Sequence, residues 1–148
     1  MAQINAYLTF DGNCEDAFLF YKSVFAGEFG QFSRFGDMPA QDGQQMPEEL
    51  RNRIMHVSLP ISQETLLMGS DTNADPNGDF TPGNNFSLSI NTDSREEAER
   101  IFYGLAEGGN ITMPLADTFW GAYFGMWTDK FGIKWMVNYD EPATSKHI

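Results

Sequence analysis

Two segments of this chain align with one another, which indicates an internal repeat. At a shift of about 81 positions, Glu15-Asp16-Ala17 falls on Glu96-Glu97-Ala98. Each copy reads as a strand with alternating apolar residues, a polar turn, an amphipathic helix and a closing glycine. A repeat of half the chain length restricts the fold to two similar modules, and we expect a binding surface where the halves meet. The other aligned residues are Phe20-Tyr21 with Ile101-Phe102, Val24 with Leu105, Gly27 with Gly108, and, with one residue added in the preceding loop, Ile4, Ala6 and Leu8 with Phe86, Leu88 and Ile90.

The composition fits one compact domain that contains both modules. Of the 148 residues, 41% are hydrophobic and 14% aromatic, which is enough for a substantial core. A formal charge of -12 opposes nucleic acid or an anionic membrane as the main partner, because binding to either depends on lysine and arginine. The sequence shows no apolar run long enough to cross a bilayer and no secretion signal, and Cys14 has no second cysteine to pair with. We therefore expect a cytoplasmic protein.

Periodicity predicts two helices and eight strands. The first helix begins near Asn13 and ends at Gly27, where glycine is a typical C-terminal stop. The second begins after Asp93 or Ser94, which are both N-cap residue types. The predicted strands cover residues 3–10, 28–35, 53–61, 64–69, 85–92, 110–115, 121–128 and 133–139.

Three segments are rich in polar and turn-forming residues. The segment 70–84 is the expected linker between modules at about 1–72 and 83–140. The segment 36–52 is a long insertion that we interpret as mobile or as a lid. The segment 141–148 reads as a polar tail.

Alternation along each strand separates two faces, because successive side chains point to opposite sides. An apolar face is expected to pack under the helices, while the opposite face mixes polar and aromatic residues as small-molecule pockets do. The apolar face collects Ala6, Leu8, Phe10, Met55, Val57, Leu59, Leu66, Met68, Phe86, Leu88, Ile90, Trp135, Val137 and Tyr139. The mixed face collects Asn5, Tyr7, Thr9, Ile54, His56, Ser58, Ser87, Ser89, Asn91, Lys134, Met136 and Asn138.

Several short motifs occur in the order and spacing of a known family. They are Phe18-Leu19-Phe20-Tyr21 ahead of Val24-Phe25, the strand with His56, Asp117-Thr118-Phe119-Trp120-Gly121, and Asp129-Lys130-Phe131-Gly132. With the doubled strand-helix-strands plan, they resemble the PhnB-like branch of the vicinal oxygen chelate superfamily, which includes glyoxalase I, extradiol dioxygenases and bleomycin-resistance proteins. The similarity extends from Ile4 to Tyr139.

The resemblance implies an α+β fold of two βαβββ modules whose curled mixed sheets surround a shared cavity, usually in a homodimer. The whole chain, 1–148, would then be a single domain of this type. Members of the branch have also been described as relatives of a demethylubiquinone methyltransferase. The sequence has no glycine-rich nucleotide-binding turn to support methyl transfer from a nucleoside cofactor, and we expect no cofactor.

The resemblance also locates the positions at which metal-dependent members carry His, Glu or Gln ligands. On the first, fourth, fifth and eighth strands these positions fall on Asn5, near Gly69, on Ser87 and on Met136. Transition metals need converging imidazole, carboxylate or thiolate groups, and these four residues supply none. We therefore expect no metal site.

His56 is the strongest candidate for chemistry. Its imidazole titrates near neutral pH, so on the mixed face it could act as a general base or donate a hydrogen bond to an anionic ligand. The alternative is a buried histidine that orders neighbouring strands. His147 lies in the polar tail and is interpreted as incidental.

Aromatic, basic and thiol groups supply further candidates. Trp120, Tyr123 and Trp127 could stack on a planar ligand, whereas Trp135 fits the core better. Arg34 and Arg53 could pair with an anionic substrate, but surface pairing with the excess carboxylates is favoured. Cys14 begins a helix, where the positive helix end could lower its pKa, although no partner base is identifiable.

Two functional classes follow, with a structural or interaction protein as a weaker third. We favour a metal-independent small-molecule-binding protein. The alternative is a glyoxalase-like or dioxygenase-like enzyme that uses His56 or an unrecognised metal site. The residues expected to contact the ligand are Tyr7, His56, Ser87, Trp120, Tyr123, Trp127 and Met136.

Overall fold

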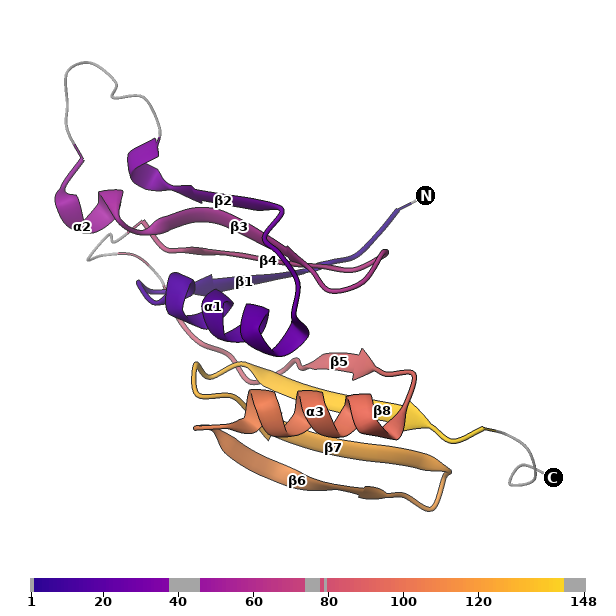
Figure 1. Ribbon diagram of the computed structural model, residues 1–148. Helices are drawn as coiled ribbons and strands as arrows, with labels where there is room; N and C mark the ends of the chain where they lie inside the picture. Colours follow the sequence, from indigo (N-terminus) through magenta and orange to yellow (C-terminus); the bar gives the residue numbers. More distant parts are fainter. Residues whose placement is uncertain (1, 38–45, 74–77, 79, 143–148) are drawn as a thin grey trace. The chain divides into compact units, whose positions relative to one another are not determined.

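The computed structural model describes residues 2–37, 46–73, 78 and 80–142. The chain divides into two compact units, Met1–Thr81 and Pro82–Ile148. Each unit contains one four-stranded sheet (Figure 1). We refer to these units as the first and second modules.

In the first module, one helix separates the first strand from the other three. The order is β1 (Ala6–Phe10), α1 (Cys14–Phe25), β2 (Gln31–Arg34), η1 (Phe35–Asp37), α2 (Glu48–Arg51), β3 (Ile54–Pro60) and β4 (Leu66–Asp71). The strands are arranged β1-β4-β3-β2, with β1 parallel to β4 and the other neighbours antiparallel. The sheet is therefore mixed.

The second module repeats this plan. The order is β5 (Leu88–Asn91), α3 (Arg95–Ala106), β6 (Asn110–Asp117), β7 (Ala122–Thr128) and β8 (Lys134–Asp140). The strands are arranged β5-β8-β7-β6, and β5 is again parallel to β8. The α+β fold of two βαβββ modules is confirmed, and α3 begins 81 positions after α1, as 95 minus 14 gives.

One face of each sheet packs against the helix of its own module, and the cores lie there (Figure 1). Leu8, Val57 and Leu59 are buried under α1, as the alternation predicts. Trp135 and Val137 are buried in the same way beneath α3, which confirms that Trp135 belongs to the core.

The alternation was wrong in β4 and at the start of β3. Leu67, Gly69 and Asp71 are the buried residues of β4, so Leu66 and Met68 lie on the face opposite α1. In β3, a bulge places Ser33 beside His56 but Arg34 beside Ile54, which inserts one residue into the alternation. Ile54 is therefore fully buried although it was predicted on the mixed face.

Several element ends also differ from expectation. Ala26, and not Gly27, takes the left-handed conformation that ends α1, with φ of 62°. The predicted linker begins too early, because Ser70 and Asp71 belong to β4. In the second module, β5 begins at Leu88, which leaves Phe86 outside the strand and 60% exposed.

The insertion 36–52 contains secondary structure that periodicity did not reveal. It includes the last two residues of η1 and the whole of α2, which are both too short to show a helical pattern. The central part of the expected lid, residues 38–45, lies outside the described residues, as does most of the polar tail. Among the helices of the described ranges, none has both the length and the apolar character needed to cross a bilayer.

Candidate functional site

Each sheet has a second face, opposite its helix, which we call the helix-free face. In the first module the register places Tyr7, Met68, Ser58 and Gln31 in one row across this face. Ser33 and His56 are paired in the next row. The strand residues on this face therefore supply hydroxyl groups, one imidazole and a thioether, and none of them is Asp, Glu, Lys or Arg.

Tyr7 and His56 form the main polar pair on this face. The Tyr7 hydroxyl lies 3.4 Å from His56 Nδ1, at the long end of the hydrogen-bond range. Their ring centroids are 5.8 Å apart with an interplanar angle of 33°. Tyr7 is 48% exposed and His56 is half-buried, so His56 is not the enclosed core histidine of the alternative interpretation.

The helix-free face of the second module is richer in thioethers. Ser89, Met136, Met126 and Met113 are register partners across β5, β8, β7 and β6. Trp120 lies in the β6–β7 turn, 52% exposed, with its ring centroid 6.2 Å from that of Phe124. Two predicted ligand contacts, Met136 and Trp120, therefore belong to this face or its border.

Ser87, which precedes β5, is partly exposed. It is one residue outside the strand, so its side chain direction does not follow from the pleat. The structure thus brings Tyr7 together with His56 in one module, whereas in the other it places Met136 on a strand and Trp120 in a turn.

Tyr123 and Trp127 lie on the opposite side of their sheet from Met136. Their register partners are Tyr139 and Trp135, on the face packed against α3. Trp127 is 1% exposed, and its ring stacks on Trp135 at 6.3 Å and meets Phe102 edge-on at 5.1 Å. This corrects their placement: both rings are covered, because Tyr123 and Trp127 lie on the face of β7 that packs against the helix.

Tyr123 instead joins a polar network that fastens α3 to the sheet. Its hydroxyl donates to Glu99 Oε2 at 2.8 Å, and the Arg95 guanidinium lies 3.9 Å from its ring centroid. Burial is the main cause that raises the pKa of Tyr123 to about 12, followed by Glu99. Arg95 also bonds Asp117 and Glu141, so one helix residue holds the ends of β6 and β8.

The two arginines considered for anion binding are paired with carboxylates. Arg34 makes a bidentate contact with Glu15, both N–O distances being 2.9 Å. Arg53 Nη1 donates to Asp11 Oδ1 at 2.9 Å, and its Nη2 lies 3.5 Å from Glu49 Oε1. The favoured interpretation, pairing with the chain's own carboxylates, is confirmed.

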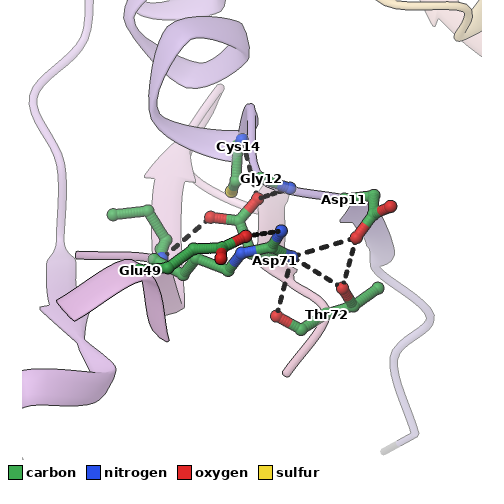
Figure 2. Close-up of polar contacts among 8 residues, drawn as sticks. Asp11, Gly12, Cys14, Glu49, Asp71 and Thr72 are labelled. Atoms are coloured by element: carbon green, nitrogen blue, oxygen red, sulfur yellow. Dashed lines mark hydrogen bonds and ion pairs between the residues drawn. The ribbon is translucent and has the colours of Figure 1, made fainter. Parts of the chain in front are cut away.

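A second polar cluster surrounds the start of α1 (Figure 2). The buried Asp71 carboxylate accepts hydrogen bonds from the backbone N–H groups of Gly12, Cys14 and Ile54, at 2.8 to 2.9 Å. The bond from Cys14 satisfies one of the donors that a helix start leaves unpaired, and the other two attach the turn before α1 and the start of β3 to the same carboxylate. Asp71 therefore caps α1 from a distant strand, while Asn13 makes no side-chain cap.

This environment makes Cys14 a poor nucleophile. The thiol is fully buried, and burial together with the nearby Asp71 and Glu15 carboxylates raises its pKa far above the ordinary value. The idea of a thiol activated by the helix end is corrected, because desolvation and the negative carboxylates outweigh the helix dipole.

The four positions at which the family's metal enzymes carry ligands do not fit a metal in this chain. Asn5 uses its Oδ1 to accept from the Leu66 N–H. Gly69 has no side chain and lies against Phe18, and Ser87 and Met136 offer weak donors. Within the ranges that the structure describes, no group of three or more His, Cys, Asp or Glu residues could hold a metal ion.

Comparison with known families agrees with this geometry. The model of the family described as 3-demethylubiquinone-9 3-methyltransferase matches residues 2–138. The chain belongs to this family, the PhnB-like branch of the vicinal oxygen chelate superfamily.

Individual relatives support the assignment over almost the whole length. Protein YjdN of Escherichia coli K12 is 35% identical, covering 91% of this chain and 93% of its own. The crystal structure of PA1353 from Pseudomonas aeruginosa is 42% identical, with a TM-score of 0.81 and coverage of 95% of this chain and 98% of that one.

Two further solved structures relate the fold to PhnB and to the wider superfamily. A PhnB protein from Bacillus cereus is 27% identical, with a TM-score of 0.70 and coverage of 93% and 99%. A glyoxylase/bleomycin resistance protein/dioxygenase domain from Frankia is 11% identical, with a TM-score of 0.65 and coverage of 99% and 98%, and so shares the fold alone.

Sequence reasoning missed part of both helix-free faces. Met68 was assigned to the wrong side of β4, because the buried face is formed by Leu67, Gly69 and Asp71, which are two residues apart. Met126 and Phe124 were not considered, although they alternate with Gly125 and Trp127. A stricter use of alternation in β7 could have found them.

Proposed function

We propose that this chain is a metal-independent small-molecule-binding protein of the glyoxalase/bleomycin resistance type. The observation that carries the proposal is the Tyr7–His56 pair on a helix-free face that has hydroxyl groups and no charged strand residue. Such a surface offers hydrogen bonds and ring contacts to a small polar or aromatic molecule. We include Met136 and Trp120 of the second module as further ligand contacts.

The metal-independent part of the proposal is supported by the chemistry of the available donors. Asn5, Gly69, Ser87 and Met136 do not form a set that transition metals prefer. We expect a chelator to leave both the melting temperature and the oligomeric state unchanged, because no metal-binding free energy is linked to folding. A melting temperature that falls with chelator and recovers with one divalent metal would contradict this part.

We also propose a cytoplasmic homodimer. Each four-stranded sheet ends in edge strands, β1 and β2 in one module and β5 and β6 in the other, and pairing of two copies is one way to cover such edges. Light scattering with size-exclusion chromatography at micromolar concentration tests the dimer, and a monomer mass would refute it.

A thermal-shift screen with small neutral aromatic and carbonyl compounds tests the binding function. For a compound that raises the melting temperature, His56→Ala should weaken binding by about 1 to 3 kcal/mol, the cost of a lost hydrogen-bond partner. Calorimetric titration measures this change. Tyr103→Phe, at an exposed tyrosine of α3, is the matched control and should bind as the wild type does. Equal affinity of His56→Ala would remove this residue from the site.

One observation favours an enzyme as the second candidate. A phenol paired with an imidazole on an exposed face is an arrangement that can transfer protons. Turnover of a compound found in the screen, lost in His56→Ala and retained after chelator, would support this alternative over a binding protein.

A further inference from the structure

The two nitrogens of His56 have different surroundings. Nδ1 faces the Tyr7 hydroxyl at 3.4 Å. Within the described part of the chain, Nε2 has no hydrogen-bond partner, and it is not among the buried polar atoms that lack one. The nearby Ser33 hydroxyl bonds the His56 backbone carbonyl and not the ring. Tyr7 is therefore the group positioned to act on the imidazole.

The direction of the Tyr7–His56 hydrogen bond follows from the chemistry of the two groups. A neutral imidazole has one N–H donor and one acceptor nitrogen. A phenol is a good hydrogen-bond donor, with a pKa of about 10, and an sp² ring nitrogen is the natural acceptor for it. The hydrogen bond at one ring nitrogen decides that the proton resides on the other.

We propose that Tyr7 is a positioning residue that fixes neutral His56 as the tautomer protonated at Nε2. His56 then presents an N–H donor to the helix-free face. The ligand group recognised here is accordingly a hydrogen-bond acceptor, and because the strand residues of this face include no lysine or arginine, a neutral acceptor such as a carbonyl oxygen. The inference about the ligand group rests on the proposed function.

The sequence left open whether His56 acts as a general base or as a hydrogen-bond donor, and the contact with Tyr7 distinguishes these roles. A general base at Nε2 needs an unprotonated Nε2, and the Tyr7 hydrogen bond places the unprotonated nitrogen at Nδ1 instead. In its neutral form, His56 therefore acts through Nε2 as a donor in recognition. Tyr7 contributes by fixing the tautomer, which its phenyl ring alone could not do.

Long-range ¹H–¹⁵N correlation spectra of the histidine rings test the tautomer without any ligand. At pH of about 8.5, where an ordinary histidine is neutral, wild-type His56 should show one tautomer, protonated at Nε2. Tyr7→Phe keeps the ring and removes the hydroxyl, and should give a mixture of tautomers with a shifted Nδ1 signal. His147→Gln assigns the two histidines, and Tyr103→Phe should reproduce the wild-type spectrum.

Two results would overturn the positioning role. One is a wild-type His56 protonated at Nδ1, and the other is an unchanged His56 spectrum in Tyr7→Phe. Backbone amide spectra of the variant show whether it is folded. If Tyr7→Phe is unfolded, a wild-type His56 protonated at Nδ1 still overturns the positioning role, and a single Nε2-protonated tautomer supports it.

Acetophenone and α-methylstyrene test whether the site recognises a hydrogen-bond acceptor, because they have similar shapes and only the first carries a carbonyl oxygen. Wild-type protein should bind acetophenone about three- to tenfold more tightly, the effect of one net hydrogen bond, and Tyr7→Phe should reduce this preference. Equal binding of the two compounds overturns the proposed recognition of a hydrogen-bond acceptor and leaves the proposed small-molecule-binding function standing. If neither compound binds, the result counts against the proposed function, and the tautomer spectra remain a separate test of Tyr7.

Discussion

Each module places a helix phenylalanine against a sheet glycine, but the glycine lies on different strands. Val57 pairs with Gly69 in the first module, and Gly125 pairs with Val137 in the second. The shift of 68 positions that relates Ile54–Pro60 to Ala122–Thr128 relates these two pairs, as 57 plus 68 gives 125. Both modules therefore leave room for a phenylalanine ring, but the glycine that provides the room is on β4 in the first module and on β7 in the second.

The helix-free faces of the two modules carry different chemical groups. At the same shift, His56 corresponds to Phe124 and Ser58 to Met126. The first face is consequently rich in hydroxyl and imidazole groups, and the second in thioether and aromatic groups. The helix-covered faces also change residue type, since Leu59 and Leu67 correspond to Trp127 and Trp135, but these residues remain buried and hydrophobic because they pack against a helix.

The largest expected effect concerns the start of each helix. Asp71→Ala should destabilise the protein by about 3 kcal/mol or more, because three backbone N–H groups lose one buried acceptor. Ser94→Ala removes the local cap of α3 and should cost about 1 kcal/mol. Urea denaturation measures both variants. An equal loss of unfolding free energy in the two variants would contradict this prediction, because Asp71 and Ser94 would then contribute alike to stability.

A smaller effect is expected at the two glycines. A Cβ at Gly69 would lie 2.6 Å from Phe18 and 2.8 Å from the Leu8 carbonyl oxygen, and a Cβ at Gly125 would lie 2.7 Å from Phe102. Each Gly→Ala variant should cost about 1 to 3 kcal/mol by overpacking.

The two sites should differ in how far a smaller helix residue relieves the clash. Double-mutant cycles with Phe18→Leu and Phe102→Leu should show the stronger coupling at Gly125, because its nearest backbone atom, Leu115 Cα, would lie 3.0 Å from the added Cβ, whereas the Leu8 carbonyl oxygen would lie 2.8 Å from a Cβ at Gly69. Equal coupling energies would mean that the modules tolerate the ring contact in the same way.

The smallest expected effect concerns two indoles that replace aliphatic residues. The register pair Leu59–Leu67 of the first module corresponds to Trp127–Trp135 of the second. The Trp135 Nε1–H donates to Asp129 Oδ2 at 2.8 Å, whereas the buried Trp127 Nε1–H has no partner among the described residues.

Trp135→Phe should therefore cost about 1 to 2 kcal/mol more than Trp127→Phe, because it removes a donor from a buried carboxylate. Thermal unfolding of the two variants, compared with the wild type, measures the difference. A larger loss in Trp127→Phe would show that volume, and not hydrogen bonding, dominates this pair.

The sequence determined the repeat, the eight strands, the two main helices and a start of the second helix after Asp93 or Ser94, of which the structure has Ser94 as the cap. These features depend on residues that are near one another in the chain: side-chain alternation, helical spacing and residue preferences at helix starts. The same local patterns failed at the bulge of β3, because one inserted residue reverses the alternation without any local signal.

Only the tertiary structure decided which distant groups meet. Asp71 bonds the Cys14 N–H across 57 positions, and Tyr7 faces His56 across 49. Strand order and register bring these residues together, and a shift of one residue would move each side chain to the other face of its sheet. The repeat could therefore be read from the sequence, whereas the pair proposed to bind a ligand could be recognised only in the folded chain.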